Sequence, residues 1–267
     1  MAVLVAADLD RTLIYSVRAA GPVDAADLID VETYEGRPAS FMTRAAAADL
    51  EVMARTVGLV PVTTRTVAQF QRVRLPGPPA GYAVTANGGV LLVDGERDPA
   101  WTASVADRLR ASAPLPEVRS YVERMCHPQW TQSVRSAEDL FCYAVLDRAA
   151  LPPSFLPQVS EWAEARGWRT SLQGRKLYWV PTALTKAAAV AEVARRLGAH
   201  RVVAAGDSLL DIDLLELADR GIHPAHGEIF DSGWSAPHVE CTTATGALAG
   251  QEIAGWLRAG GKASVPA

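Results

Sequence analysis

The hydrophobic residues of the chain gather in short runs, and one of these runs opens the sequence. Residues 3–7 are uniformly apolar, and residues 201–205 form a similar run far along the chain. Apolar runs without alternation are typical of strands buried on both faces of a parallel sheet. Shorter runs at residues 59–62 and 82–86 predict two further strands, although Pro61 cannot donate a hydrogen bond to a sheet ladder.

Helical patterns separate these strands. Thr43 can cap a helix that runs to about residue 56, and Gly58 can end it. Residues 14–40 show no such period, and we expect them to form a long irregular excursion. Alternation of strands and helices at both ends of the chain predicts a doubly wound, Rossmann-like parallel-sheet core of the α/β class. The other predicted elements of this core are helices at residues 185–197, 211–218 and 246–257 and a short strand at residues 239–242.

The chain changes character after Asn87-Gly88-Gly89. Residues 90–93 lead into Asp94-Gly95, a dipeptide that favours a hairpin turn. Hairpins with helices between them indicate an antiparallel α+β unit. We therefore expect residues 88–180 to be an inserted domain, and residues 1–87 with 181–267 to form the core. Within the insertion, helices are predicted at residues 101–110, 117–125 and 155–166, and strands at residues 141–146, 168–172 and 176–180.

The overall charge and the cysteines argue against several classes of protein. A net charge of -4 and a pI near 5.8 give no basic surface for nucleic acid or for an anionic membrane. The first apolar run lacks the basic residues that begin a signal peptide, and no run reaches the roughly 18 apolar residues of a membrane span. Cys126, Cys142 and Cys241 suit neither a disulfide framework nor a zinc site. We expect a cytoplasmic protein.

Acidic residues follow two of the predicted core strands. Asp8 and Asp10 come after the first strand, and Asp207 and Asp211 come after the strand at residues 201–205. Ligands of open α/β sheets bind beyond the carboxyl ends of the strands, and there these acids would face a single lysine, Lys186. Two like charges ~4 Å apart repel by roughly 4 kcal/mol at an effective dielectric constant near 20. A cation with oxygen ligands would relieve this repulsion, which points to Mg²⁺.

Simpler structural interpretations exist for several of these residues. Asp8 and Asp10 could form a turn, and Asp211 could be an acid that stabilises a helix N-terminus. His223 and His226 are potential metal ligands, but the proline and glycine beside them indicate a loop instead.

The order and spacing of the polar residues resemble the four motifs of the haloacid dehalogenase-like phosphatase superfamily. Asp8-Leu9-Asp10-Arg11-Thr12 resembles the first motif, and Gly206-Asp207-Ser208-Leu209-Leu210-Asp211 resembles the fourth. Thr63 is similar to the second motif, and Lys186 to the third. The insertion resembles the large α/β cap of the type II branch, which includes Cof-like and sucrose-phosphate phosphatases. The first motif is also similar to that of members found in tellurium-resistance-type gene clusters.

The resemblance implies a role for each motif residue. Asp8 would attack phosphorus, and Asp10 would protonate the leaving oxygen and then activate water. Thr63 and Lys186 would hold the phosphoryl oxygens. The acids implied around Mg²⁺ are Asp8, Asp10 (through its backbone carbonyl), Asp207 and Asp211.

Some positions depart from the family pattern. Arg11 and Thr64 stand where glycine is frequent, and Leu210 replaces an asparagine of the fourth motif. Thr64 is also an alternative to Thr63 as the phosphate-binding hydroxyl. The candidate substrate-binding residues are Arg11, Thr64, Arg65, Asn87 and Arg175.

These observations predict a Mg²⁺-dependent phosphatase that acts on a small phosphorylated metabolite, a sugar or nucleoside phosphate, through an aspartyl-phosphate. Two alternatives remain open. A phosphomutase would use the same phosphoaspartate, but its turnover would need a bisphosphate activator. A non-catalytic phosphate sensor or partner-binding protein would keep the fold alone, and the presence of Asp8, Asp10, Lys186 and Asp207 together favours an enzyme.

Overall fold

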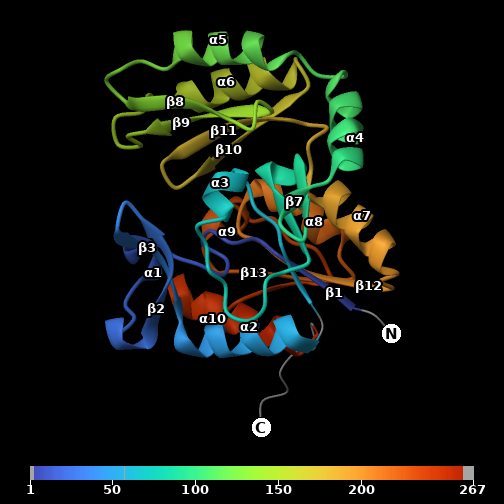
Figure 1. The fold of residues 1–267 in the computed structure, drawn as a ribbon. Coiled ribbons are helices and arrows are strands. Elements are labelled where there is room, and N and C mark those ends of the chain that lie inside the picture. Colours follow the sequence, from blue (N-terminus) through green and yellow to red (C-terminus); the bar gives the residue numbers. More distant parts are fainter. Residues whose placement is uncertain (1–2, 57, 261–267) are drawn as a thin grey trace. The chain divides into compact units, whose positions relative to one another are not determined.

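The computed structural model describes residues 3–56 and 58–260, which fall into two compact units (Figure 1). The first unit takes in the described residues up to Asp98 and from Lys186 onward, and the second spans Pro99–Thr185. The insertion was predicted at residues 88–180. The compact second unit begins and ends later in the chain than this prediction. The short strands that follow Gly88 belong to the first unit.

A five-stranded parallel sheet forms the centre of the first unit. The strand order is β14-β13-β12-β1-β4, and every neighbouring pair is parallel. The central strand β1 lies between β12 and β4, and its Val5 pairs with Val203 on one side and Leu59 on the other. Four of these strands were predicted, and β13 was missed. The bounds are β1 Val3–Ala7, β4 Leu59–Pro61, β12 Arg201–Ala205, β13 Arg220–His223 and β14 Val239–Cys241.

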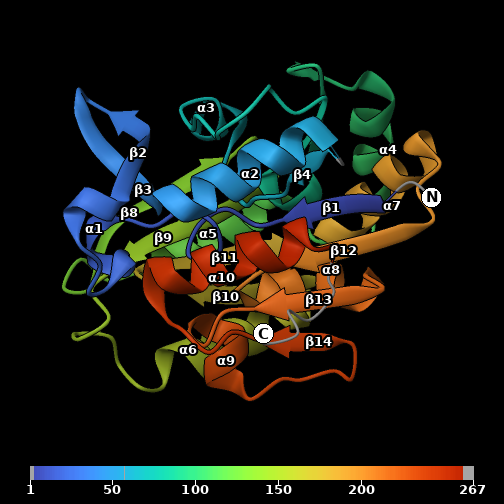
Figure 2. The same cartoon turned by 90° about the horizontal axis from the view of Figure 1, so that it is seen from below.

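Helices cover both faces of this sheet (Figures 1 and 2). The helices α2 (Arg44–Thr56) and α10 (Gly246–Arg258) pack together on one face. On the other face α7 (Lys186–Leu197) packs on α8 (Ile212–Leu217), which contacts β12 and β13. The predicted cap of α2 is present, because Thr43 Oγ1 accepts a hydrogen bond from the Ala46 N–H at 3.1 Å. A further short helix, α9, spans Gly227–Ser232.

The segment predicted to be irregular, residues 14–40, is largely ordered. It contains a short helix α1 (Val17–Ala20), a 3₁₀ turn η1 (Ala25–Asp27) and an antiparallel hairpin of β2 (Leu28–Tyr34) and β3 (Arg37–Thr43). The expectation was wrong because the inside-outside alternation of β2 is broken: Val31 and its neighbour Glu32 are both buried. Register shifts around Glu32 mark a β-bulge, which hides the period of two on which strand prediction depends.

The first unit also contains a small antiparallel sheet. Its order is β5-β6-β7, and Val62 joins it to the strand β4 through a parallel bridge to Val84. The predicted hairpin turn is present, with positive φ at Asp94 and Gly95. The bounds are α3 Val67–Phe70, β5 Tyr82–Thr85, the 3₁₀ turn η2 Ala86–Gly88, β6 Val90–Val93 and β7 Glu96–Arg97.

The second unit is a four-stranded antiparallel sheet with the order β10-β11-β9-β8. Trp168 and Trp179 are buried in it, and Trp168 Nε1 donates to the Ala113 carbonyl at 2.9 Å. Three of its strands and its three helices were predicted, whereas β8 was missed. The bounds are α4 Pro99–Leu109, α5 Leu115–Met125, β8 Thr131–Ala137, β9 Phe141–Leu146, α6 Phe155–Glu164, β10 Trp168–Gln173 and β11 Lys176–Pro181.

The predicted fold class is therefore confirmed: a doubly wound α/β core carries an antiparallel α+β insertion. Among the described helices, each lacks either the length or the apolar character needed to cross a membrane.

Candidate active site

Asp8 is the first residue beyond β1, at the carboxyl end of the parallel sheet. Its backbone N–H donates to the Ala205 carbonyl at 2.9 Å, so the ladder between β1 and β12 continues to this residue. The residue is only 4% exposed. Lys186 Nζ donates to one carboxylate oxygen at 2.7 Å, and Thr12 Oγ1 donates to the other at 3.4 Å. The sheet thus holds Asp8 in direct contact with a buried cation.

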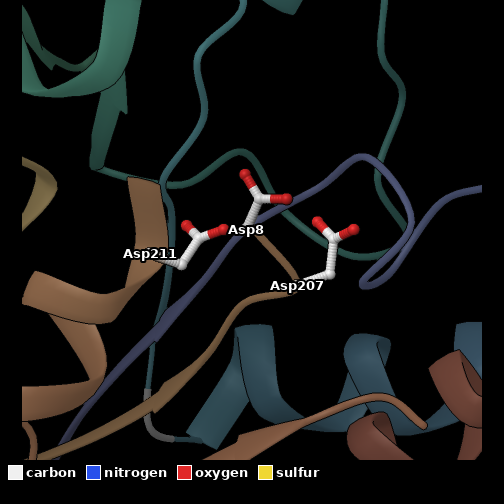
Figure 3. A group of neighbouring side chains, drawn as sticks. All are labelled: Asp8, Asp207 and Asp211. Atoms are coloured by element: carbon white, nitrogen blue, oxygen red, sulfur yellow. The ribbon is translucent and has the colours of Figure 1, made fainter. Parts of the chain in front are cut away.

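Two more carboxylates come from the neighbouring strand β12. Asp207 lies just after this strand, and Asp211 ends the 3₁₀ turn η3 (Leu209–Asp211). Oxygen atoms of Asp8, Asp207 and Asp211 all lie within 4.8 Å of one another. Figure 3 shows these three side chains turned to the same side of the chain. Asp211 is fixed by Ser208, whose backbone N–H and Oγ donate to it at 3.0 and 2.7 Å.

Two glycines make room for this cluster. A Cβ atom at Gly206 would overlap the side chain of Asp211. Gly227 has a φ of +91°, and a Cβ atom there would lie 2.7 Å from both the backbone and a carboxylate oxygen of Asp207. A larger residue at either position would force one of the acids to move.

The three acids carry more negative charge than the protein neutralises around them. Lys186 is 1% exposed and contacts both Asp8 and Asp211. Burial raises the pKa of Asp8 to about 7, against the lowering effect of Lys186 and with a further contribution from Asp211. Burial, Asp8 and Asp211 also raise the pKa of Asp207 well above its ordinary value. Burial favours the neutral form of Lys186, but the two adjacent carboxylates raise its pKa and keep it charged.

Arg11 lies beside Asp207. Its backbone has a φ of 65°, the left-handed region that glycine adopts without strain. Its Nε atom is 3.3 Å from Asp207 Oδ2, and among the described residues this buried Nε makes no hydrogen bond. The guanidinium therefore supplies a second positive charge at the edge of the carboxylate cluster.

His226 holds the backbone of Arg11 and is not a metal ligand. Its Nε2 lies 2.9 Å from the Arg11 carbonyl, and its Nδ1 accepts from the Gly246 N–H at 3.2 Å. Both ring nitrogens are therefore committed to the backbone, with the proton on Nε2. The loop interpretation was wrong for His223, which ends β13.

Asp10 points to a different partner from Asp8. Arg65 Nε and Nη2 donate to its two carboxylate oxygens at 2.7 and 2.8 Å. Arg65 also pairs through Nη1 with Glu32 at 2.9 Å. The carboxylate of Asp10 thus takes no part in the cluster of Asp8, Asp207 and Asp211.

The predicted phosphate-binding hydroxyls lie at the end of the adjacent strand β4. Thr63 is fully buried, its N–H donates to the Val84 carbonyl at 2.8 Å, and its Oγ1 accepts from the Arg65 N–H at 3.2 Å. Thr64 is also buried. The N–H of Asn87 donates to the Thr63 carbonyl at 2.9 Å, with Asn87 at a φ of 55°.

The remaining substrate candidate, Arg175, lies in the turn between β10 and β11 of the second unit, and its role stays a prediction. The sequence analysis missed Glu32 and its partners Ser40 and Arg72, which the structure connects to Arg65 and Asp10. A buried acid in a segment without periodicity gives no sequence signal of this kind.

Comparisons with known proteins agree with this fold. No protein-family model matches the chain, and no curated protein matches its sequence. Among solved structures, it is similar to the sucrose-phosphatase of Synechocystis sp. PCC6803, determined with sucrose and phosphate, at a TM-score of 0.66 and 16% identity, covering 96% of this chain and 98% of that one. It is also similar to BT1666 of Bacteroides thetaiotaomicron, a phosphatase of the haloalkanoate (HAD) superfamily, at a TM-score of 0.55 and 15% identity, covering 98% and 96% of the two chains.

A third similar structure is the subclass IIB sugar phosphatase BT4131, with a TM-score of 0.60, 13% identity and coverage of 98% and 100% of the two chains. The structural neighbours are thus HAD phosphatases, and this chain shares their fold over 96–98% of its length. The similarity to members from tellurium-resistance-type gene clusters stays a prediction.

Proposed function

We propose that this chain is a cytoplasmic, Mg²⁺-dependent phosphomonoesterase that acts on a small phosphorylated metabolite through an aspartyl-phosphate. One observation carries the proposal: a buried carboxylate, Asp8, touches Lys186 and lies within 4.8 Å of the carboxylates of Asp207 and Asp211. A nucleophile, a fixed cation and a pair of further acids at the end of a parallel sheet suit phosphoryl transfer.

The reaction then divides into two displacements. Asp8 Oδ would attack phosphorus, the bond from phosphorus to the leaving oxygen would break, and Asp10 would give that oxygen a proton. Water would next attack phosphorus and break the bond to Asp8, while Asp10 takes the proton of the water. Lys186, fixed by Asp8 and Asp211, would stabilise negative charge on the phosphoryl oxygens, with the hydroxyl of Thr63 or Thr64.

The residues present fit a magnesium ion. Asp8, Asp207 and Asp211 offer only oxygen donors, which Mg²⁺ prefers, and burial together with the neighbouring acids raises the pKa values of Asp8 and Asp207. Asp8 and Asp207 would hold the ion together with the backbone carbonyl of Asp10, and Asp211 would support it. When bound, the ion would neutralise charge on the transferring phosphoryl group.

The proposed substrate class is a sugar phosphate, with a nucleoside phosphate as the alternative. The support is the fold shared with a sucrose-phosphatase and with a sugar phosphatase at 16% and 13% identity. Candidate contacts in the first unit are Arg11 and Asn87, and Arg175 of the second unit stays a separate prediction.

The test is phosphate release from a broad panel of phosphometabolites with Mg²⁺, using the wild type and Asp8→Asn. We expect hydrolysis of at least one sugar or nucleoside phosphate, and loss of all of it in the variant. Release from no compound, or release that Asp8→Asn leaves intact, would refute the proposal. Turnover that appears only with a bisphosphate activator, with little free phosphate, would indicate the mutase instead.

A further inference from the structure

Arg65 binds the carboxylate of Asp10 through two hydrogen bonds. Both carboxylate oxygens accept a hydrogen bond from the guanidinium, at 2.7 and 2.8 Å. A two-point contact between guanidinium and carboxylate fixes the plane of the carboxylate and is stronger than a neutral hydrogen bond. The side chain of Asp10 is 45% exposed, whereas that of Arg65 is only 12% exposed. A buried arginine therefore sets the orientation of an accessible acid.

Arg65 is in turn held by Glu32. This acid is 4% exposed and pairs with Arg65 Nη1 at 2.9 Å. It also accepts hydrogen bonds from Ser40 Oγ at 2.6 Å and from Arg72 Nε at 3.1 Å. Burial opposes its ionisation, but Ser40 and the two arginines hold the pKa of Glu32 below its ordinary value. Both members of the Glu32–Arg65 pair therefore remain charged.

The β-bulge in β2 is what turns Glu32 toward Arg65. Side chains on a regular strand alternate between two faces, yet the adjacent residues Val31 and Glu32 are both buried. Val31 packs into the core of the first unit, and the shift of register at the bulge directs Glu32 to the arginine. A bridge between Glu32 and Val73 fastens the strand to the segment after α3.

From this series of contacts we infer that Arg65 is the positioning residue of Asp10, and that Glu32 fixes Arg65 in turn. The hairpin of β2 and β3 thereby orients the carboxyl group of Asp10, which acts as acid and base in the proposed reaction. This inference rests on the proposed function. The side chain of Asp10 is 45% exposed, so a substrate oxygen can reach its carboxyl group while Arg65 holds it.

A pair of substrates with different leaving groups tests the inference. The 4-nitrophenolate of 4-nitrophenyl phosphate leaves without a proton, whereas the leaving group of phenyl phosphate, which has nearly the same shape, is more basic and needs one. Arg65→Lys keeps the charge and loses the two-point contact. We expect kcat/KM to fall by about 10²-fold for phenyl phosphate, the size of a general-acid contribution, and by less than about tenfold for 4-nitrophenyl phosphate.

Two further variants separate positioning from folding and from substrate binding. Glu32→Gln should shift the selectivity in the same direction by a smaller amount, about threefold to tenfold, because it frees Arg65 without removing it. Arg74→Gln is the control from the same segment: its exposed guanidinium donates to the Gln71 carbonyl, outside the contacts described for Asp10, Arg65 and Glu32, and its removal should leave the ratio between the substrates unchanged. If Arg65→Lys does not fold, the selectivity of Glu32→Gln between the two substrates tests the inference by itself.

Equal losses on both substrates in Arg65→Lys and Glu32→Gln would overturn the inference, since a substrate contact or a purely structural role lowers both rates alike. Unchanged rates would overturn it as well. This failure is distinct from that of the proposed function, in which the wild type would release phosphate from no compound of the panel, or Asp8→Asn would leave the release intact.

Discussion

Two networks of charged side chains begin at the same turn after β1, and they differ in how far their positive and negative charges balance. The Asp8 network consists of Asp8, Asp207, Asp211 and Lys186, with Arg11 at its edge. The second, here termed the Asp10 network, consists of two acids, Asp10 and Glu32, and two guanidiniums, those of Arg65 and Arg72.

The difference in balance suggests a difference in role. In the Asp8 network the buried acids outnumber the buried cation, and the pKa of Asp8 rises to about 7. In the Asp10 network charges match, and the pKa of its buried acid Glu32 is lowered. The first arrangement is suited to accept a further cation, and the second to hold a side chain in place. The predictions below test this contrast.

The largest effect is expected from Lys186→Met, which leaves the three acids of the Asp8 network without their buried cation. Turnover of the best substrate should fall by about 10²–10³-fold, since a fixed positive group would be lost from the phosphoryl site. The metal-free protein should lose about 3–5 kcal/mol of unfolding free energy, because removing one partner of a buried ion pair leaves an uncompensated buried charge. Steady-state kinetics and urea unfolding measure the two effects.

The control is Arg195→Met on the same helix, α7. Its guanidinium is 72% exposed and pairs only with Glu192 among the interactions described for it. Turnover and stability should both stay close to those of the wild type. A loss in this control as large as in Lys186→Met would show that α7 as a whole, and not its buried cation, is responsible.

Magnesium should stabilise the protein through the Asp8 network alone. At a concentration of ~100 times its Kd, a ligand that binds only the folded state adds about 2.7 kcal/mol. For a chain of this size that corresponds to a rise in Tm of about 5–10 °C. Thermal unfolding with Mg²⁺ or EDTA measures it. Asp207→Asn should abolish the rise and Asp231→Asn, an exposed acid on α9, should keep it; equal rises in both variants would contradict the metal site.

The stability of the metal-free protein should depend on pH through Asp8. Its pKa is raised from 3.8 to about 7 on folding, so the folded state binds the proton more tightly. The resulting stability is fully present below pH ~4 and is lost as the pH rises through about 7. Asp8→Asn cannot ionise, so its Tm relative to the wild type should increase between pH 5 and 8 in EDTA. A constant difference across this range would contradict the raised pKa.

The smallest effect is expected from Arg11→Gly. Arg11 Nε lies 3.3 Å from Asp207, so its positive charge competes with a metal ion for that carboxylate. Removing it should tighten Mg²⁺ binding by up to about fivefold, the size of an exposed or partly exposed ion pair. Calorimetry gives the Kd, and Arg11→Lys, which keeps the charge, should stay near the wild-type value. Weaker binding in Arg11→Gly would instead show that Arg11 supports the metal site.

The motif residues of the Asp8 network could be predicted from the sequence because they follow buried strands. Continuous apolar runs identified β1 and β12, and in a parallel sheet the carboxyl ends of such strands meet at one edge. The topology of the sheet therefore brings Asp8 and Asp207 together, independently of the conformation of the loops between them. The strand β13 and the strand β8 of the second unit were missed; β13 (Arg-Gly-Ile-His) contains no apolar run, and the residues of β8 are mostly half-buried or exposed.

The Asp10 network could not be predicted in the same way. Its central acid, Glu32, lies in a segment without a clear period, and it is buried only because a bulge interrupts β2. Arg65 was expected to contact substrate, and no local pattern indicates that a carboxylate from a distant hairpin would bind it. Pairing between residues far apart in the chain depends on register and side-chain direction, which a local pattern does not contain.

The sequence by itself determined which residues could do chemistry and that a parallel sheet would gather them, because burial of apolar strands and the position of polar residues after them are local properties. Only the tertiary structure decided how the charges are shared: Asp8 with Lys186 and two further acids, Asp10 with Arg65 and Glu32. That division depends on the left-handed turn at Arg11, the bulge at Glu32 and the absence of a side chain at Gly227, each of which acts through contacts between distant segments.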